Sequence, residues 1–261
     1  MTKREKELDR IAKLLIRRDL ALIEANERLI AMDKAKSEFI AIAAHQLRTP
    51  LSGVKWILKM MIDEDIGPLT TEQKDFLQKG YENNERMIHL VNDLLNVARI
   101  EEGRLVYKQQ KFQLEDVIEE IIGIFQDDIA EKQLNLEFRK PKQRLPKIKA
   151  DLEKIRLVLQ NLINNAIKYT ADTGRIWIKI EQDGNALKVS IRDTGIGIPR
   201  EQQERLFSKF FRGKNVIKME TQGTGLGLYI TKNIIEAHNG QINFESTKNK
   251  GSLFWFILPL I

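Results

Sequence analysis

Apolar residues recur with a seven-residue period through residues 1–36, among charged positions and without glycine or proline. Leucines form one row, and a second row of apolar residues lies three residues further on. Arg18 is the one charged residue in the second row. The two rows are Leu8, Leu15, Leu22 and Leu29, then Ile11, Ala25 and Met32. A heptad pattern sustained over about four repeats is typical of a coiled coil. A single amphipathic helix is the alternative interpretation, but no neighbouring segment obviously covers the stripe.

A helical apolar spacing continues beyond this segment and is interrupted by "DEDIGPLT" at residues 63–70, where Gly67 and Pro68 favour a turn. The apolar positions are Ile40, Ala44, Leu47, Leu51, Val54, Leu58 and Met61 before the turn, and Leu77, Tyr81, Ile88, Val91, Leu95 and Ala98 after it. Two helices joined by a short loop form an antiparallel hairpin. Because two helices alone bury little surface, we expect two copies to pair as a dimeric four-helix bundle.

The second half of the chain changes to alternating patterns that predict strands. The expected strands are 134–140, 175–182, 186–193, 241–247 and 252–259, and helical patterns cover 114–131, 151–169 and 225–238. Asp183-Gly184 between two of the strands indicates a hairpin. The fold class is therefore α+β: a coiled coil and helical hairpin, then an α/β sandwich with a mostly antiparallel sheet and helices on one face. The boundary is expected near residues 103–110.

Composition narrows the function classes. The 261 residues are 42% hydrophobic, no run of about 18 apolar residues is present, and "MTKREKELDR" is no secretory signal. We therefore expect a cytoplasmic segment without membrane contact of its own. The chain has no cysteine, which excludes disulfides and thiolate zinc sites. It has only three histidines, which argues against a multi-histidine metal site. The net charge of +6 is spread among mixed signs, so we expect no nucleic-acid partner.

A first candidate site is "HQLRTP", at residues 45–50 on the first long helix. His45 lies one position off the apolar stripe, so its ring should face solvent, with Thr49 on the same face four residues later. Pro50 deprives the carbonyl of Gln46 of its helical donor and should kink the helix. An exposed imidazole that is partly neutral at pH 7 can attack a phosphorus centre. An ordinary surface histidine is the alternative.

A second candidate is "NLINNAIKYT", at residues 161–170. Helical spacing puts Asn161, Asn165 and Lys168 on one face, opposite the apolar residues. Amide oxygens beside a lysine suit phosphates and a hydrated Mg²⁺, which takes few protein ligands. A solvated polar face is the alternative explanation.

Two glycine-rich stretches complete the set. In "DTGIGIP" (193–199), Asp193 could accept a hydrogen bond from an exocyclic amine, and its glycines would allow a ligand to approach; an ordinary turn is the alternative. In "GTGLGLYI" (223–230), three glycines precede a helix whose free N–H groups can bind phosphate, although the spacing is not that of a P-loop. The polar, basic part of the stretch 207–222 between them is expected to be a mobile lid.

In this order the motifs resemble those of the sensor histidine kinases of two-component systems. The resemblance covers residues 37–261, with an H-box around His45, an N-box at 161–170, a G1 box at 193–199, an F-box around 207–212 and a G2 box at 223–229. It implies a coiled-coil signalling helix at 1–36, a dimerisation and histidine-phosphotransfer domain at 37–102, and an ATP-binding domain of the Bergerat (GHKL) type at 103–261.

The resemblance also implies roles for individual residues. His45 would accept the phosphoryl group through Nε2, next to Gln46, and Thr49 would orient water when the response regulator is dephosphorylated. Arg212 would meet the γ-phosphate, with Lys214 and Lys218 as weaker candidates. The nucleotide-binding set would be Asn161, Asn165, Lys168, Tyr169, Asp193, Gly195, Gly197, Gly223, Gly225 and Gly227, of which Asn161 and Asn165 would also hold Mg²⁺.

The implied activity is autophosphorylation of His45 from ATP and Mg²⁺, followed by transfer to an aspartate of a response regulator receiver domain. The implied assembly is a homodimer with a sensor lying upstream. Gln46 departs from the Asp or Glu most familiar after the histidine, which leaves open a phosphatase-biased or kinase-weak relay. Another GHKL-type ATPase, such as a chaperone or mismatch-repair ATPase, is the further alternative. Asn239 replaces a common glycine, but asparagine also tolerates a left-handed cap.

Overall fold

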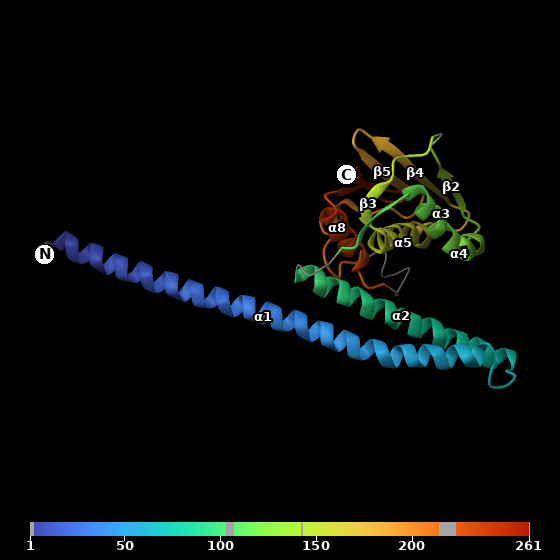
Figure 1. Ribbon diagram of the computed structural model, residues 1–261, viewed down its shortest axis with the longest axis horizontal. Coiled ribbons are helices and arrows are strands. Elements are labelled where there is room, and N and C mark those ends of the chain that lie inside the picture. Colours follow the sequence, from blue (N-terminus) through green and yellow to red (C-terminus); the bar gives the residue numbers. More distant parts are fainter. Residues whose placement is uncertain (1–2, 103–106, 142, 214–222, 261) are drawn as a thin grey trace. The chain divides into compact units, whose positions relative to one another are not determined.

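The computed structural model describes residues 3–102, 107–141, 143–213 and 223–260 (Figure 1). The chain divides into two compact units, Met1–Arg104 and Leu105–Ile261. Lys214, Lys218 and the latter part of the expected lid lie outside the described residues. No helix within the described ranges is long and apolar enough to span a bilayer.

The first unit is built on one long helix, α1 (Lys3–Ile62), which contains Pro50. The helix stays continuous through Pro50, and Figure 1 shows its axis change direction gently in the part that pairs with α2. Three leucines of the heptad row, Leu15, Leu22 and Leu29, face solvent in the single chain, since they are 52%, 68% and 69% exposed. This stripe is open to a second helix.

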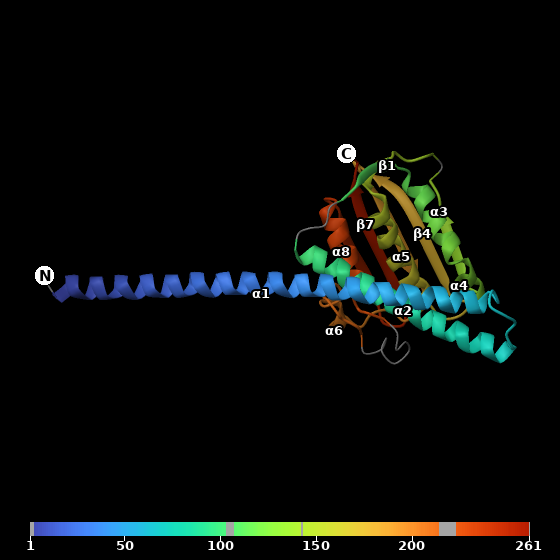
Figure 2. The ribbon, with the colours of Figure 1, turned by 60° about the horizontal axis from the view of Figure 1, so that its bottom comes forward.

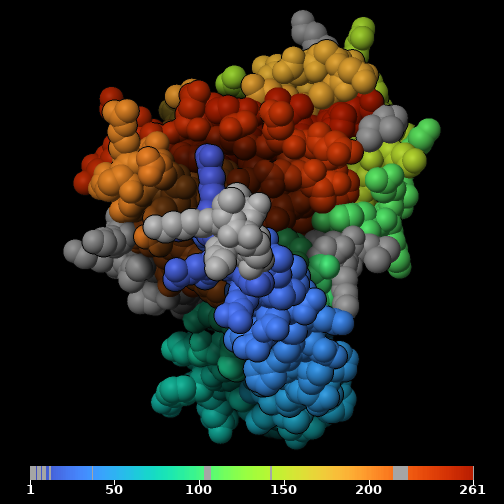
Figure 3. All heavy atoms as spheres, turned by 90° about the vertical axis from the view of Figure 1, so that its left-hand side faces the viewer, coloured from blue at the N-terminus to red at the C-terminus, as the bar shows by residue number. Residues whose placement is uncertain are grey.

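The second helix of the hairpin, α2 (Thr71–Glu101), begins with a capping box. The Gln73 amide donates to the Thr70 hydroxyl, and the Thr70 amide donates to the Gln73 side chain, so two N–H groups at the helix start are satisfied. Figure 3 shows α1 and α2 packed side by side. The predicted hairpin and its turn are confirmed.

The hairpin buries only part of the predicted apolar stripe. Ala44, Val91 and Leu95 form its buried core, whereas Leu47 and Val54 on the same stripe are about half exposed. The predicted spacing was right, but α2 covers only one side of the stripe. The other side stays open to a further helix.

The second unit contains a five-stranded sheet of order β2-β4-β5-β7-β6, in which β2 runs parallel to β4 and the other neighbours are antiparallel. Its strands are β2 (Asn135–Arg139), β4 (Arg175–Asp183), β5 (Ala186–Asp193), β6 (Gln241–Thr247) and β7 (Gly251–Pro259). A separate antiparallel pair, β1 (Gln109–Phe112) with β3 (Ile148–Asp151), was not predicted from the sequence.

Helices cover one face of the large sheet (Figure 2). They are α3 (Leu114–Ile124), α4 (Gln126–Glu131), α5 (Leu152–Tyr169) and α8 (Gly227–Ala237), with the short α6 (Arg200–Gln203) after β5. The single helix expected at 114–131 is therefore wrong in one respect: it breaks at Phe125, whose amide bonds the carbonyl three residues back instead of four. The α/β sandwich itself is confirmed.

Two turn predictions are also confirmed. Gly184 has φ +60° in the β4–β5 hairpin, where Asp183 pairs with Ala186. Asn239 has φ +56° directly after α8, and the following Gly240 amide returns to the Ile235 carbonyl at 2.9 Å. Asparagine thus forms the left-handed cap, as its short polar side chain allows.

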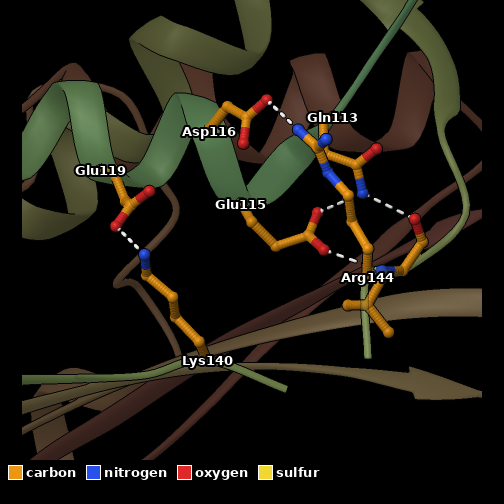
Figure 4. Close-up of polar contacts among 7 residues, drawn as sticks. Gln113, Glu115, Asp116, Glu119, Lys140 and Arg144 are labelled. Atoms are coloured by element: carbon orange, nitrogen blue, oxygen red, sulfur yellow. Dashed lines mark hydrogen bonds and ion pairs between the residues drawn. The ribbon is translucent and has the colours of Figure 1, made fainter. Parts of the chain in front are cut away.

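A buried polar clasp fixes the chain after β2 against α3 (Figure 4). Gln113 Nε2 donates to the Leu145 carbonyl at 2.6 Å and to Glu115 Oε2 at 2.8 Å, and the Leu145 amide donates to Glu115 Oε1 at 2.9 Å. Exposed ion pairs of Arg144 with Asp116 and of Lys140 with Glu119 flank it. The clasp has no role in the site described below.

The C-terminus of α5 depends on one lysine from the turn after α4. Lys132 Nζ donates to the carbonyls of Ile167 and Lys168, both at 3.0 Å, and of Thr170 at 3.4 Å. These carbonyls lie at the negative end of the helix dipole, so the ammonium group both pairs and neutralises them.

Replacing Lys132 with methionine keeps the apolar stem but leaves the carbonyls at the end of α5 without their ammonium donor. We expect a loss of about 1–2 kcal/mol, which lowers the thermal midpoint by about 2–8 °C. Lys140→Met is the matched control, because it removes only an exposed ion pair worth about 0–1 kcal/mol. Scanning calorimetry of both variants decides, and equal shifts would contradict the capping role.

Candidate functional site

The three candidates on α1 lie at the surface of the first unit. His45, Gln46 and Thr49 are all exposed, as the offset of His45 from the apolar stripe predicted. Thr49 follows one turn later on the same side of the helix. The imidazole is therefore accessible to a phosphoryl donor and to a second protein, as a phosphoacceptor requires.

The candidates of the second unit begin on the polar face of α5. Asn161 Nδ2 donates to the Gly227 carbonyl and to the Thr231 hydroxyl, both at 3.3 Å, and so joins α5 to the start of α8. Because its amide nitrogen is used in this way, Asn161 presents its oxygen as the acceptor. Asn165 is half-buried one turn further along the same face.

The end of α5 meets the turn that follows β5. The Ile196 amide donates to the Tyr169 carbonyl at 3.2 Å, and a Cβ on Gly195 would stand 2.3 Å from that carbonyl oxygen. A side chain at position 195 would therefore collide with the protein's own backbone, which is a reason for glycine that the sequence did not reveal. The Lys168 ammonium group lies 5.9 Å from the centre of the Tyr169 ring.

Asp193 is a buried carboxylate at the end of β5, and only 7% of its surface is exposed. Its Oδ1 accepts the Gly195 amide at 2.7 Å and the Ser252 amide at 3.2 Å. Burial raises the pKa of this carboxyl, while the two backbone hydrogen bonds lower it. Both of these bonds fall on Oδ1, so Oδ2 could accept a hydrogen bond from a ligand.

The remaining glycines also pack against protein. Gly225 has φ +69°, and its Cβ would stand 2.7 Å from the backbone of Phe210; Gly197 has φ +59° beside the Thr247 carbonyl. A Cβ on Gly223 or on Gly227 would meet only side chains at ordinary contact distances, those of Arg212 and Asn161 respectively. Arg212 thus borders the glycine-rich stretch at residue 223.

The structure brings most of the predicted nucleotide-binding residues into one region of the second unit, where α5, the start of α8 and the turn after β5 meet. Two contributors were missed from the sequence. Thr231, fully buried, could have been found because it lies four residues after Gly227 on the same helix face. Ser252 gave no local signal, because its amide reaches Asp193 only through the pairing of β5 with β7.

Family comparisons fit this geometry. Residues 35–103 match the family described as "His Kinase A (phospho-acceptor) domain". Residues 150–261 match "Histidine kinase-, DNA gyrase B-, and HSP90-like ATPase". The chain belongs to the sensor histidine kinases of two-component systems.

A curated relative of this chain is also a histidine kinase. The circadian input-output histidine kinase CikA of Synechococcus elongatus is 33% identical over 247 residues, which cover 94% of this chain and 33% of CikA. The chain therefore spans about a third of that curated relative.

Among solved structures, the catalytic domain of histidine kinase ThkA is 37% identical with a TM-score of 0.52, covering 58% of this chain and 95% of that one. ThkA in complex with the response regulator TrrA covers 86% of this chain and 61% of that one, at 27% identity and a TM-score of 0.58. Full-length ShkA with AMPPNP has a TM-score of 0.69 at 28% identity, covering 85% of this chain and 45% of that one.

Replacing Asp193 with asparagine should separate ligand binding from stability. Asn keeps Oδ1 for the Gly195 and Ser252 amides, but it puts an N–H donor where the base's amine must donate, so ADP affinity should fall about tenfold or more.

A carboxyl whose pKa is raised favours folding at low pH, and that contribution is lost as pH rises through the raised pKa. As pH rises from 4 to 7, the parent protein should therefore lose stability that the Asp193→Asn variant does not lose, so the difference in stability should change in favour of the variant.

Calorimetric titration with ADP and thermal midpoints at the two pH values test both parts of this expectation. A variant that binds ADP like the parent would place the adenine elsewhere. If Asp193→Asn changes the thermal midpoint relative to the parent by the same amount at pH 4 and pH 7, ionisation of the buried carboxyl does not destabilise the fold.

Proposed function

We propose that this chain is the kinase core of a two-component sensor: it phosphorylates His45 from Mg²⁺-ATP and then passes the phosphoryl group to an aspartate of a response regulator. One observation supports this most strongly. The buried Asp193 acceptor and the polar face of α5 lie in the unit that directly follows, along the chain, a hairpin bearing an exposed histidine.

The second unit acts as the nucleotide-binding domain. Asp193 accepts the adenine amine, and Lys168 and Tyr169 lie at the end of α5 next to the turn that carries Asp193. Asn161 and Asn165 offer amide oxygens on the same helix, a donor set that fits Mg²⁺, which prefers oxygen ligands and retains water. When bound, Mg²⁺ would neutralise charge on the transferring phosphoryl group. Arg212 supplies a further positive charge beside Gly223.

In the first unit the neutral imidazole of His45 attacks through Nε2. The Nε2–P bond forms as the bond from phosphorus to the bridging oxygen of ATP breaks, and ADP leaves with the electron pair. The ring gains positive charge, which is relieved when the Nδ1 proton departs. The Gln46 amide oxygen can accept a hydrogen bond from Nδ1–H but, unlike a carboxylate, it cannot take the proton.

The functional protein is a homodimer in this proposal. Leu22 and Leu29 are open along the leading helix, and Leu47 and Val54 are open along the hairpin, so the unburied stripe runs through most of α1. A second copy covers both segments by forming a coiled coil and a four-helix bundle. On this basis residues 1–36 serve as the signalling helix, 37–102 as the dimerisation and phosphotransfer domain, and 103–261 as the ATP-binding domain.

The partner in the second step is the receiver domain of a response regulator, which is supported by the likeness to ThkA in complex with the response regulator TrrA. Trp56 lies three helical turns after His45, close to the same face of α1, and is 64% exposed. An exposed tryptophan is a common anchor at protein interfaces. The match of residues 35–103 to a phosphoacceptor domain argues against an ATPase of the chaperone or mismatch-repair type.

Incubation with γ-labelled ATP and Mg²⁺, followed by mapping of the labelled residue, tests the proposal. We expect acid-labile, base-stable label on His45. It should be absent from His45→Gln and from Asn165→Ala, although Asn165→Ala should remain folded because the residue lies on the polar face of α5. Label on a serine, or none with intact ATP binding, would refute the proposed reaction.

Gln46 makes a separate prediction. A carboxylate at this position can accept the Nδ1 proton, and general-base assistance is typically worth about 10²–10⁴-fold. Gln46→Glu should therefore raise the initial autophosphorylation rate at pH 7–8, with a gain that shrinks below about pH 4–5, where the new carboxyl protonates. An unchanged or lower rate would show that the amide is sufficient.

A further inference from the structure

At the start of the second unit the chain makes a partly buried set of contacts that includes none of the proposed nucleotide-binding residues. Tyr107 and Lys108 are the first described residues of the second unit. The Tyr107 ring meets the ring of His238 edge-on, with 4.8 Å between centroids. The Lys108 amide donates to Asp151 Oδ2 at 2.8 Å. We call Tyr107, Asp151 and His238 the entry clamp.

His238 is held in one tautomer by the backbone. Its Nδ1 lies 2.7 Å from the Ile234 carbonyl, which can only accept, so Nδ1 carries the hydrogen. Its Nε2 accepts the Asp151 amide at 3.1 Å and must be unprotonated. The ring is 6% exposed and has no hydrogen-bonding capacity left over. This accounts for a buried histidine that the proposed reaction does not need.

Asp151 connects the entering chain to α5. Its Oδ1 accepts the Lys154 amide at 3.1 Å and caps the start of that helix, while Oδ2 holds Lys108. Asn161 follows ten residues later, about 15 Å along the helix at 1.5 Å per residue. His238 in turn ends α8, whose first residue is Gly227. The clamp therefore lies at the start of α5 and at the end of α8, and other parts of these two helices form the proposed nucleotide site.

We propose that the entry clamp is a positioning device for phosphoryl transfer: it fixes the path of the chain into the ATP-binding unit and so orients that unit for attack by His45. This inference rests on the proposed function. Transfer between two units joined by one chain segment requires an in-line approach, and a misplacement of about 1 Å can cost on the order of 10²-fold in rate. Nucleotide binding, by contrast, needs only contacts within the second unit.

The test compares four variants of the full chain. Tyr107→Ala and His238→Leu remove the ring contact or the acceptor. Asp151→Asn retains a good helix cap and an oxygen for Lys154, but turns a donor toward the Lys108 amide. Tyr107→Phe is the matched control, since it keeps the ring against His238. We expect the first three to lower kcat for His45 phosphorylation about tenfold or more with KM for ATP and ADP affinity unchanged, and Tyr107→Phe to match the parent.

Two results would overturn the inference: unchanged kcat in all variants, or a fall in ADP affinity that parallels the fall in rate, which indicates support of the fold alone. Hydrogen exchange at the Lys108 amide tests the clamp without any phosphorylation. It should speed up at least tenfold in Asp151→Asn, and unchanged exchange would refute the clamp even in a protein with no kinase activity. Absence of label on parental His45 would instead count against the proposed function.

Discussion

A buried carboxylate at the end of β5 is the constraint on which the catalytic unit is organised. Removing Asp193 from water is costly, and the structure offsets that cost with two backbone amides, from Gly195 and Ser252. The first requires a tight turn pressed against the end of α5, and the second requires β7 to pair with β5 in one register. The carboxylate thus ties the turn, the sheet and the nucleotide-binding helix together.

The two units place opposite demands on their reactive groups. His45 is exposed, as the proposed function requires of a residue that would meet first a nucleotide and then another protein. Asp193 is enclosed, and in the proposed function its hydrogen bond to an amine would gain strength because water does not compete there. Separate folding units allow both demands to be met.

Much of this architecture could be predicted from local sequence patterns. The helix period located the hairpin, Asp183-Gly184 marked the β4–β5 turn, and Asn239 was recognised as a left-handed cap. Features that depend on contacts between distant segments escaped prediction. The contact of the Ser252 amide with Asp193 and the β1–β3 pair both depend on strand pairing, and the close packing of Gly195 against the Tyr169 carbonyl depends on the fold. Leu47 and Val54 share a stripe with buried residues but remain open, because periodicity does not say how many neighbours a helix has.

The most direct test of the site is an NMR titration of isotope-labelled protein with Mg²⁺-ADP. The account predicts that the backbone amides of Gly195 and Ser252 and the side-chain amides of Asn161 and Asn165 shift together at one affinity. The side-chain amide of Gln113, in the clasp on α3, should not move. Saturable binding that leaves Gly195 and Ser252 unshifted would contradict the assignment of the site to Asp193.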